Sequence, residues 1–516
     1  MALIPLEEAV AARYSARELL ERTLDAGSFV SWDTAPVDVE PGPEYAAELA
    51  RARERSGCDE AVLTGEGLLR GRRVAVLACE FAFLAGSIGV AAAERLTAAV
   101  ERATAERLPL LAAPASGGTR MQEGTVAFLS MVKISTAITA HKAAGLPYLV
   151  YLRHPTTGGV LASWGSLGHV TVAEPGALIG FLGPRVYEAL YGRPFPEGIQ
   201  RAENLYRHGL VDAVLAPEEL PGIAERAFNV LLARGQERPA PPPPAAGPAP
   251  EGPVWDSVRR SRRADRPGVR RLLRTAATDV VPLNGTGEGE ADPGLLLALA
   301  RFGGAPCVLL GQDRTRQSAE HPMGPAGLRE ARRGMRLAAE LDLPLVTVID
   351  TPGAALSKEA EEQGMAGQIA RCLAELATLR APTVAVLLGQ GTGGGALALA
   401  PADRVLCARH AWLSPLPPEG ASAIVHRTTE RAGELAELQG IGSADLLAAG
   451  IVDRIVAERD DAADEPVAFC RRMGGAIARE LVALPGTDPA GRLAARTARY
   501  RGLGLPGGSA RRPESR

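Results

Sequence analysis

The segment LPYLVYLRHPTTGGV, residues 146–160, shows the pattern on which the fold of this chain depends. Its mostly apolar part ends at His154, and the pair Gly158-Gly159 follows shortly after. A short apolar run bounded by turn residues is typical of a buried strand. A glycine pair after such a strand leaves backbone N–H groups uncovered by side chains. The segment therefore predicts a buried strand, a tight loop and the start of a helix.

The same pattern occurs at three other places in the chain. They are LPLLAAPA (108–115) before Ser116-Gly117-Gly118, LPLVTVID (343–350) before Thr351-Pro352-Gly353-Ala354, and PTVAVLLGQ (382–390) before Gly393-Gly394-Gly395-Ala396. Strand, glycine loop and helix in this order predict parallel β/α units, and hence an α/β fold.

The spacing of these loops indicates an internal duplication. Gly117 and Gly158 are 41 residues apart, and so are Gly353 and Gly394. Farther along, HGLVDAV (208–214) is echoed by AGIVDRI (449–455). Equal spacing and matched loops favour two copies of one domain.

A proline-rich run, residues 236–253, divides the two halves. Such a run favours extended polyproline geometry, and a spacer is a simpler interpretation than an SH3-type ligand. The sequence thus predicts a first domain over 1–235, a linker over 236–255, a second domain over 256–500 and a flexible tail over 501–516.

Composition excludes several classes of function. The chain has 516 residues, a net charge of −3 and only 4% aromatic residues, which disfavours nucleic-acid binding. The arginine-rich segment 258–274 is interpreted as a solvated helix or linker edge. The six cysteines are too far apart for a zinc knuckle, so no metal is expected. The N-terminal residues lack a signal-peptide pattern and no stretch suits a membrane span, so we expect a cytoplasmic protein.

The glycine loops are the candidate sites of chemistry. A helix that begins at such a loop directs free N–H groups and a positive dipole end toward a developing anion. One loop alone would be explained by close packing, whereas two at matched spacing favour oxyanion holes. Neither a P-loop nor a G-x-S-x-G elbow is present. His154 and His208 are interpreted as packing or capping residues, and Asp350 as an anchor of its loop.

Several motifs resemble those of bacterial acetyl-CoA carboxylase carboxyltransferase. SGGTRMQE (116–123), PTTGGVLAS (155–163) and AEPGALIGFLGPR (173–185) resemble motifs of its β subunit. IDTPGA (349–354), GQGTGGGAL (389–397) and PEGAS (418–422) resemble motifs of its α subunit. The resemblance extends from about Ser15 to about Val456 and is that of a β–α fusion.

This resemblance implies two tandem crotonase-like domains of the β-β-α superhelix type. It implies that Gly158 and Gly159 hold the enolate oxygen of a CoA thioester, and that Gly394 and Gly395 hold the ureido oxygen of biotin. The α-proton would pass to the biotin anion, and the carbanion would attack carbon dioxide. The other residues implied in substrate binding are Ser116, Gly117, Gly118, Arg120, Gly353, Ala354 and Ala396.

The resemblance also implies partners. Lys133 lies in MVKI, which departs from the A-M-K-M pattern of biotin attachment, so biotin is expected on a separate carrier protein served by a biotin carboxylase. A homo-oligomer with sites between protomers is implied as well. The β subunit's four-cysteine zinc ribbon is absent, Gln390 and Thr392-Gly393 replace Glu and x-Ser, and Ala355-Leu356 replace Tyr-Pro.

Acetyl-CoA, converted to malonyl-CoA, is the first expected substrate. Propionyl-CoA or a longer acyl-CoA, and decarboxylation of a malonyl-type thioester, remain open alternatives. A non-catalytic scaffold that binds acyl-CoA or the carrier is the alternative outside enzymes. Loss of a glycine pair would favour the scaffold, and both pairs are intact.

Overall fold

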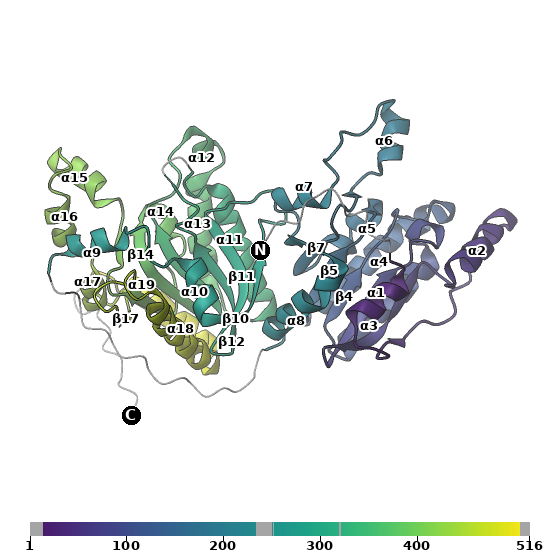
Figure 1. The fold of residues 1–516 in the computed structure, drawn as a ribbon, viewed down its shortest axis with the longest axis horizontal. Helices are drawn as coiled ribbons and strands as arrows, with labels where there is room; N and C mark the ends of the chain where they lie inside the picture. Colours follow the sequence, from purple (N-terminus) through teal and green to yellow (C-terminus); the bar gives the residue numbers. More distant parts are fainter. Residues whose placement is uncertain (1–13, 234–249, 251, 319–320, 506–516) are drawn as a thin grey trace. The chain divides into compact units, whose positions relative to one another are not determined.

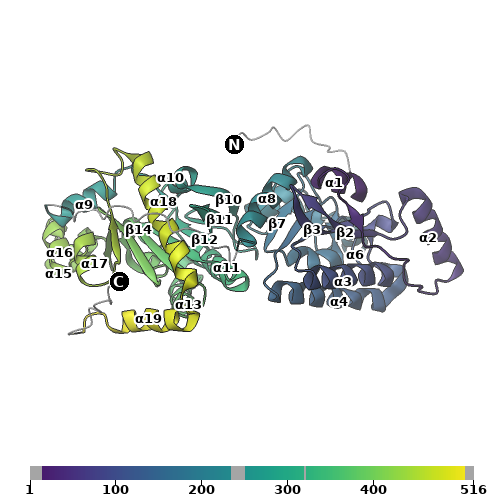
Figure 2. The ribbon, with the colours of Figure 1, turned by 90° about the horizontal axis from the view of Figure 1, so that it is seen from below.

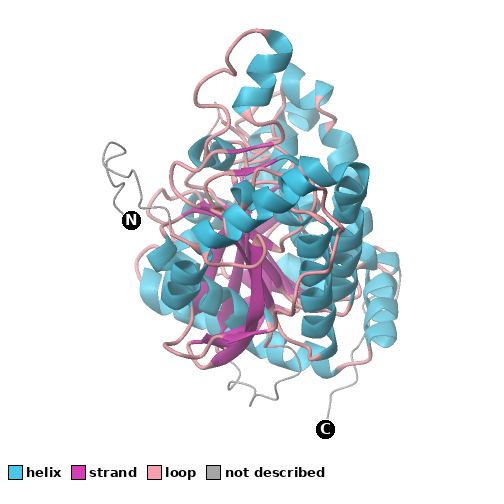
Figure 3. Cartoon of the chain, turned by 90° about the vertical axis from the view of Figure 1, so that its right-hand side faces the viewer, coloured by secondary structure: helices cyan, strands magenta, loops and turns pink. Residues whose placement is uncertain are grey.

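The computed structural model of the chain describes residues 14–233, 250, 252–318 and 321–505 (Figure 1). Most of the predicted linker, residues 236–255, and residues 506–516 of the predicted tail lie outside the described residues. The chain divides into two compact units, one of Met1–Phe228 with Gly287–Gly289 and one of Asn229–Thr286 with Glu290–Arg516. Each unit is an α/β structure in which helices cover strands (Figure 3).

Among the described residues, the first unit holds a seven-stranded sheet in the order β1-β2-β3-β4-β5-β7-β9. The β2 strand pairs antiparallel with β1 and β3, and the strands from β3 to β9 run parallel. The short strands β6 and β8 form a separate parallel pair. The strands are β1 (Val30–Ser31), β2 (Val62–Leu69), β3 (Arg72–Cys79), β4 (Leu110–Ala113), β5 (Tyr148–Leu152), β6 (Thr156–Thr157), β7 (Val170–Ala173), β8 (Ile179–Gly180) and β9 (Ala213–Val214).

Two long helices, α3 and α4, lie against one face of this sheet, and α1 and α8 lie on the other (Figure 2). All five residues of β5, YLVYL, are buried, as the apolar run predicts. The core between β5 and the helices includes Leu96 of α3 and Ile134 of α4. The helices are α1 (Ala16–Thr23), α2 (Pro43–Ser56), α3 (Val90–Ala105), α4 (Gly124–Ala143), α5 (Gly158–Leu161), α6 (Pro184–Tyr191), α7 (Ala202–Arg207) and α8 (Leu220–Leu231).

The second unit repeats this topology. In the described part of the chain its sheet has the order β10-β11-β12-β13-β14-β15-β17, with β16 paired to the end of β14. Again the outer pairs β10–β11 and β11–β12 are antiparallel and the strands from β12 onward are parallel. The strands are β10 (Ala277–Leu283), β11 (Leu295–Phe302), β12 (Ala305–Gln312), β13 (Leu345–Thr351), β14 (Thr383–Thr392), β15 (Arg404–Ala408), β16 (Trp412–Ser414) and β17 (Arg454–Val456).

The helices α11 and α13 pack on each other beside this sheet, and α10 packs on α18, which runs across the strands (Figure 2). The stripe Leu328, Ala331, Met335 and Ala338 of α11 is buried because these residues recur every three or four positions. The helices are α9 (Val254–Ser261), α10 (Val269–Ala276), α11 (Pro325–Leu341), α12 (Lys358–Glu362), α13 (Met365–Thr378), α14 (Gly393–Leu397), α15 (Pro418–His426), α16 (Ala432–Leu438), α17 (Ser443–Ala448), α18 (Pro466–Ala483) and α19 (Pro489–Arg501).

The echoed segments 208–214 and 449–455 perform the same task in each unit. The Asp212 carboxylate accepts a hydrogen bond from Thr171 N at 2.8 Å, and the N–H of Asp212 donates to Thr171 O at 2.7 Å. Asp453 exchanges the same two bonds with Val405. In both units the aspartate joins the last strand to its neighbour, which supports the duplication.

The arginine-rich segment 258–274 is partly internal to its unit. Arg266 is buried and pairs with Glu458 at 2.7 Å and Asp461 at 3.2 Å. Arg263 also pairs with Asp461, at 3.3 Å. These arginines attach α9 and the residues after it to the end of the sheet. Arg259, Arg270, Arg271 and Arg274 are exposed, so the predicted solvated edge describes only part of the segment. None of the described helices is long and apolar enough to cross a membrane.

Candidate functional site

The glycine pair of the first unit stands between a strand and a helix. Gly158 is the first residue of α5 and has φ +62°, a conformation that glycine adopts without strain. Its N–H donates to Phe181 O at 3.1 Å. The N–H of Ala162, at the end of this turn, donates to Gly158 O at 3.0 Å. Among the described residues, therefore, the N–H of Gly159 has no acceptor, and it is the member of the predicted pair that remains available.

A second loop supports this turn from behind. Ser116 is fully buried, and its Oγ donates to Gly86 O at 2.6 Å and accepts from Gly118 N at 3.0 Å. The N–H of Gly117 donates to Ala85 O at 2.8 Å. The structure thus brings the predicted residues 116–118 against the predicted pair 158–159, although their own polar groups are already bonded.

Arg120, which is predicted to line the substrate pocket, is buried in an ion pair. Its side chain is 1% exposed and grips the Glu60 carboxylate with both terminal nitrogens, at 2.5 and 3.0 Å. It also donates to Ser87 O at 2.7 Å. Because these partners occupy the guanidinium, we assign Arg120 to the support of the loop before α4, and its contact with substrate stays a prediction.

An apolar groove of about 920 Å³ begins at Gly158 and Gly159 and follows α4. Phe128, at 60% exposure, and Val132, at 63%, stand on its wall with their side chains open to solvent. The lining residues are Phe128, Leu129, Met131, Val132, Ser135, Thr136, Thr139, Ala140, Ala143, Gly158, Gly159, Ala162, Ser163, Phe181 and Leu182. When a bound molecule fills this groove and displaces its water, the apolar lining strengthens the electrostatic effect of a backbone donor at the end of the groove.

The second unit builds a matching turn. Gly393 is the first residue of α14 and has φ +64°. The N–H of Ala398 donates to Gly394 O at 2.9 Å. Gly394 and Gly395 lie in the first turn of the helix, and in the described part of the chain their N–H groups have no acceptor. Ala354 lies against Gly395, and a Cβ added to Gly395 would stand 3.4 Å from the Cβ of Ala354. Ala396 is fully buried, so its side chain belongs to the packing of α14.

The glycine loops of the first unit match those of the second, but the alignment between them is shifted by one residue from the predicted alignment. Gly118 and Gly353 both have positive φ, +108° and +139°, and the N–H of each donates to a hydroxyl two residues earlier, Ser116 at 3.0 Å and Thr351 at 3.1 Å. Gly158 and Gly393 likewise correspond. The pairs are therefore Gly118–Gly158 and Gly353–Gly393, both 40 residues apart, and the predicted alignment of Gly117 with Gly353 and of Gly158 with Gly394 is wrong by one.

Two of the polar residues to which the sequence analysis gave no catalytic role, Asp350 and His154, make hydrogen bonds to the backbone. Asp350 is fully buried, burial raises its pKa, and its Oδ1 accepts from Gln390 N at 3.1 Å. His154 Nδ1 accepts from Leu178 N at 3.0 Å. His208 is exposed at the surface. Lys133 projects from α4 and pairs with Glu94. The predicted anchoring of a loop by Asp350 and the capping by His154 agree with these bonds.

An arginine that the sequence did not single out lies beside Gln390. Arg262 donates through Nε to Gln390 Oε1 at 3.2 Å and binds both oxygens of Glu419, at 2.5 and 3.0 Å. The bonds to Arg262 lower the pKa of Glu419. Glu419 belongs to the PEGAS motif, and that motif was the available signal for this contact. Leu356, one of the departures from the family pattern, is 91% exposed.

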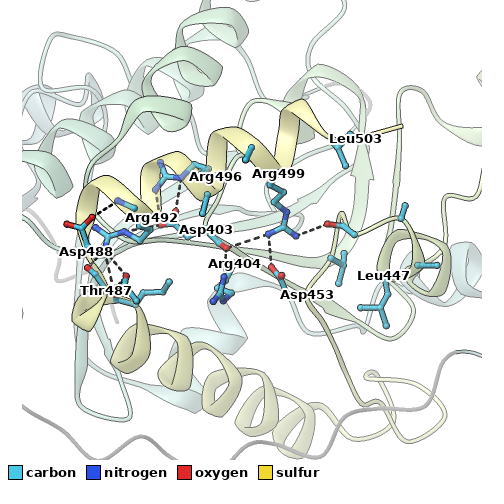
Figure 4. Close-up of a pocket in the computed structure, with 18 residues that line it drawn as sticks. Asp403, Arg404, Leu447, Asp453, Thr487, Asp488, Arg492, Arg496, Arg499 and Leu503 are labelled. Carbon is cyan, nitrogen blue, oxygen red and sulfur yellow. Dashed lines mark hydrogen bonds and ion pairs between the residues drawn. The ribbon is translucent and has the colours of Figure 1, made fainter. Parts of the chain in front are cut away.

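A second cavity of about 870 Å³ lies in the second unit between α17 and α19 (Figure 4). Arg496 of α19 binds both oxygens of Asp403, at 2.8 and 2.9 Å, and Arg499 binds Asp453 at 2.8 Å. These pairs attach α19 to the sheet. None of the predicted site residues lines this cavity, so the glycine loops remain the candidate site. Among the described residues no group of three or more His, Cys, Asp or Glu side chains is placed to hold a metal ion.

Comparison with known proteins identifies a family over most of the chain. The family described as carboxyl transferase domain matches residues 11–483. A probable biotin-dependent acyl-coenzyme A carboxylase beta3 subunit of Mycobacterium tuberculosis (strain ATCC 25618 / H37Rv) is 65% identical over 495 residues, which cover 96% of this chain and 99% of that protein. The acetyl-coenzyme A carboxylase carboxyl transferase subunits beta/alpha of Salinispora arenicola (strain CNS-205) is 39% identical over 521 residues, 96% of this chain and 91% of that protein.

A solved structure shares the fold. Transcarboxylase 12S superposes with a TM-score of 0.73 at 21% identity, over 92% of this chain and 90% of that one. The match of family, sequence and fold extends over nearly the whole chain and includes both units. The chain therefore belongs to the carboxyl transferase family of biotin-dependent acyl-CoA carboxylases.

Proposed function

We propose that this chain transfers the carboxyl group of carboxybiotin, held on a separate carrier protein, to acetyl-CoA and so forms malonyl-CoA. The observation that supports this most directly is the unbonded N–H of Gly159 at the head of an apolar groove. The matching turn at Gly394 and Gly395 in the second unit offers a second set of donors. We also propose that each unit is a crotonase-like domain, with boundaries near residues 1–235 and 256–500.

In the first unit the thioester oxygen would accept from Gly159. Removal of the α-proton turns this oxygen into an enolate, and a backbone donor in an apolar groove then stabilises the charge as it develops. Loss of one such donor costs roughly 3–4 kcal/mol of transition-state stabilisation in other enzymes. Gly158 contributes in another way, because its positive φ turns the chain so that Gly159 faces the groove. Ser116, Gly117 and Gly118 hold the turn in place from behind.

In the second unit the N–H groups of Gly394 and Gly395 suit an oxygen that carries partial negative charge, such as the ureido oxygen of biotin. Carboxybiotin, when bound, supplies the carboxyl group that is transferred. Gly353 and Ala354 form the wall behind this turn, and Ala396 packs α14 into its unit. His154 and Asp350 are taken up in structural bonds, which supports chemistry that depends on backbone donors.

The partners follow from the same proposal. A biotin carboxyl carrier protein and a biotin carboxylase would be required, and acyl-CoA would be the small-molecule substrate. We also propose a homo-oligomer, because Phe128, Leu129 and Val132 expose an apolar stripe of α4 beside the groove. The related transcarboxylase 12S is described as a hexamer.

The deciding experiment is the reverse reaction with free biotin. Purified full-length protein is given malonyl-CoA or methylmalonyl-CoA, and release of acetyl-CoA or propionyl-CoA is followed with and without biotin. Biotin-dependent release from malonyl-CoA supports the proposal. A higher rate with methylmalonyl-CoA would identify propionyl-CoA as the acceptor in place of acetyl-CoA. Release that needs no biotin would contradict carboxyl transfer between biotin and the thioester. No release from either thioester, with CoA binding intact, would favour a non-catalytic scaffold.

A further inference from the structure

Gln312, the last residue of β12, makes two hydrogen bonds inside the second unit. Its side chain is fully buried. The Nε2 donates to Gly395 O at 2.8 Å, and the Oε1 accepts from Asp350 N at 3.2 Å. A single amide therefore connects three elements, namely β12, the end of β13 and the first turn of α14.

The bond to Gly395 reaches the turn that carries the free N–H groups. The N–H groups of Ala398 and Leu399 donate to the carbonyl oxygens of Gly394 and Ala396, at 2.9 and 3.2 Å. The Gly395 carbonyl lies between these two acceptors and is satisfied by Gln312. A short helix that ends after one turn satisfies few of its own carbonyl groups, so a side chain that takes over one of them fixes the direction of the turn.

Among its described residues, the first unit has no such connection. The strand pairs Ala78–Ala113 and Gly311–Val348 occupy the same place in the two sheets, which makes Cys79 the counterpart of Gln312. Gln312 accepts the N–H of Asp350 at 3.2 Å, and no corresponding bond to the Cys79 thiol is present among the described residues. A thiol is too short to reach the helix as well. In the part of the chain that the structure describes, the Gln312 amide adds a bond to the glycine turn of the second unit, and Cys79 adds none to that of the first.

We propose that Gln312 is a positioning residue for carboxyl transfer, which orients the Gly394–Gly395 turn through its bond to the Gly395 carbonyl. This rests on the proposed function, in which that turn binds an oxygen of the biotin group. The amide does not touch the substrate. It holds two N–H groups in the direction that a preorganised donor needs, and small misorientations of such donors reduce their effect.

The test compares Gln312→Met with Thr347→Val in the full-length protein. Methionine keeps the length of the side chain and removes both hydrogen bonds. Thr347 supplies the control because its buried Oγ1 donates at 2.8 Å to Leu399 O, just beyond the other end of α14. Both variants lose a buried bond that holds α14, and only the first touches the glycine turn. Thermal unfolding measures the stability of each variant, so that the two can be compared at equal loss of Tm. Steady-state kinetics of the biotin-dependent reverse reaction gives kcat, KM for biotin and KM for the acyl-CoA.

We expect Gln312→Met to lower kcat/KM for biotin by about 10- to 100-fold and to leave KM for the acyl-CoA within about 2-fold. Thr347→Val should leave both constants within about 2-fold. Equal kinetic losses in the two variants, or equal rises in both KM values, would show a merely structural role and overturn the inference. Gly394→Val separates the two proposals. If it is inactive while Gln312→Met is fully active, the positioning role fails, and if it keeps full activity, the proposed function of the turn fails.

Discussion

Gly118 and Gly158 face each other so closely that a Cβ added to Gly118 would stand 3.3 Å from the Cα of Gly158. Both have positive φ, +108° and +62°, so a side chain at either position would strain the backbone and crowd its neighbour. The contact between the two loops therefore depends on glycine at both positions. In the first unit it explains why both loops carry glycine at the point where they meet.

Gly159→Val tests the proposed oxyanion donor. A Cβ at this position would lie 2.9 Å from Thr119 Oγ1 and 3.3 Å from Met131 Cγ, so the added side chain pushes the turn out of place and covers the N–H. We expect kcat to fall by about 10²- to 10³-fold in the reverse reaction. The control is Gly42→Ala, whose Cβ would meet no atom within 4 Å. A valine variant that folds normally and turns over near the wild-type rate would contradict the role of Gly159.

Arg120→Met tests the assignment of Arg120 to structure. The change leaves Glu60 buried at 3% exposure without its principal partner, and breaking a buried pair in this way costs about 3–5 kcal/mol. Urea denaturation should show this loss. The double variant Arg120→Met with Glu60→Gln should recover part of it, since the unpaired charge is gone. If Arg120→Met instead keeps its stability and raises KM for acyl-CoA by 10-fold or more, Arg120 binds substrate after all.

Gln390→Glu restores the residue of the family pattern. The Oε1 of either side chain can accept from Arg262 Nε, so we expect the local structure to persist. The added carboxylate would share the guanidinium with Glu419. We predict a change in kcat/KM for biotin of less than about 3-fold, because the hydrogen bond is retained. Kinetics of the reverse reaction checks this, and a change beyond 10-fold would show that the charge at position 390 matters to the reaction.

Glu330→Gln tests the pH dependence of stability. Burial raises the pKa of Glu330 on α11 to about 8, and its Oε2 has no hydrogen-bond partner in the described part of the chain. The unfolded chain ionises this carboxyl near pH 4.5, whereas the folded chain keeps its proton up to about pH 8. The folded state thus binds more protons between these values, and its stability falls as the pH rises through them.

The Glu330→Gln variant should therefore lose less stability than the wild type between pH 5 and 8. Tm measured across this range would show a shallower slope for the variant, with the largest gain over the wild type at the upper end. Parallel slopes for the two proteins would mean that Glu330 ionises at its ordinary pKa in the folded state.

The strands and both glycine loops could be predicted because they depend on local signals. The buried run of β5 and the glycines after it are adjacent in sequence, and each loop was expected where it is found. The register between the two units was missed because Gly393-Gly394-Gly395 contains two glycine pairs. A different signal would have given the correct alignment of the two units. In each unit a hydroxyl residue stands two positions before the glycine with positive φ, Ser116 before Gly118 and Thr351 before Gly353.

The roles of individual polar residues were harder to predict because they depend on distant partners. Arg120 is taken up by Glu60, which lies 60 residues earlier, and Arg262 meets Glu419, which lies 157 residues later. No periodicity connects such pairs, and only the folding of the strands between them brings them together. The same holds for the amide bridge of Gln312, whose partners come from two other elements.

The thiol of Cys79, at the end of β3, can report local opening of the first unit through its rate of alkylation. Cys79 is fully buried, and burial raises its pKa to about 11, so an alkylating reagent finds neither access nor thiolate while the unit stays closed. Its modification would proceed only through openings that separate β3 from the Ser116 loop. The rate of alkylation at Cys79 thus reports how often the wall behind the first glycine turn opens, with no substitution in the chain.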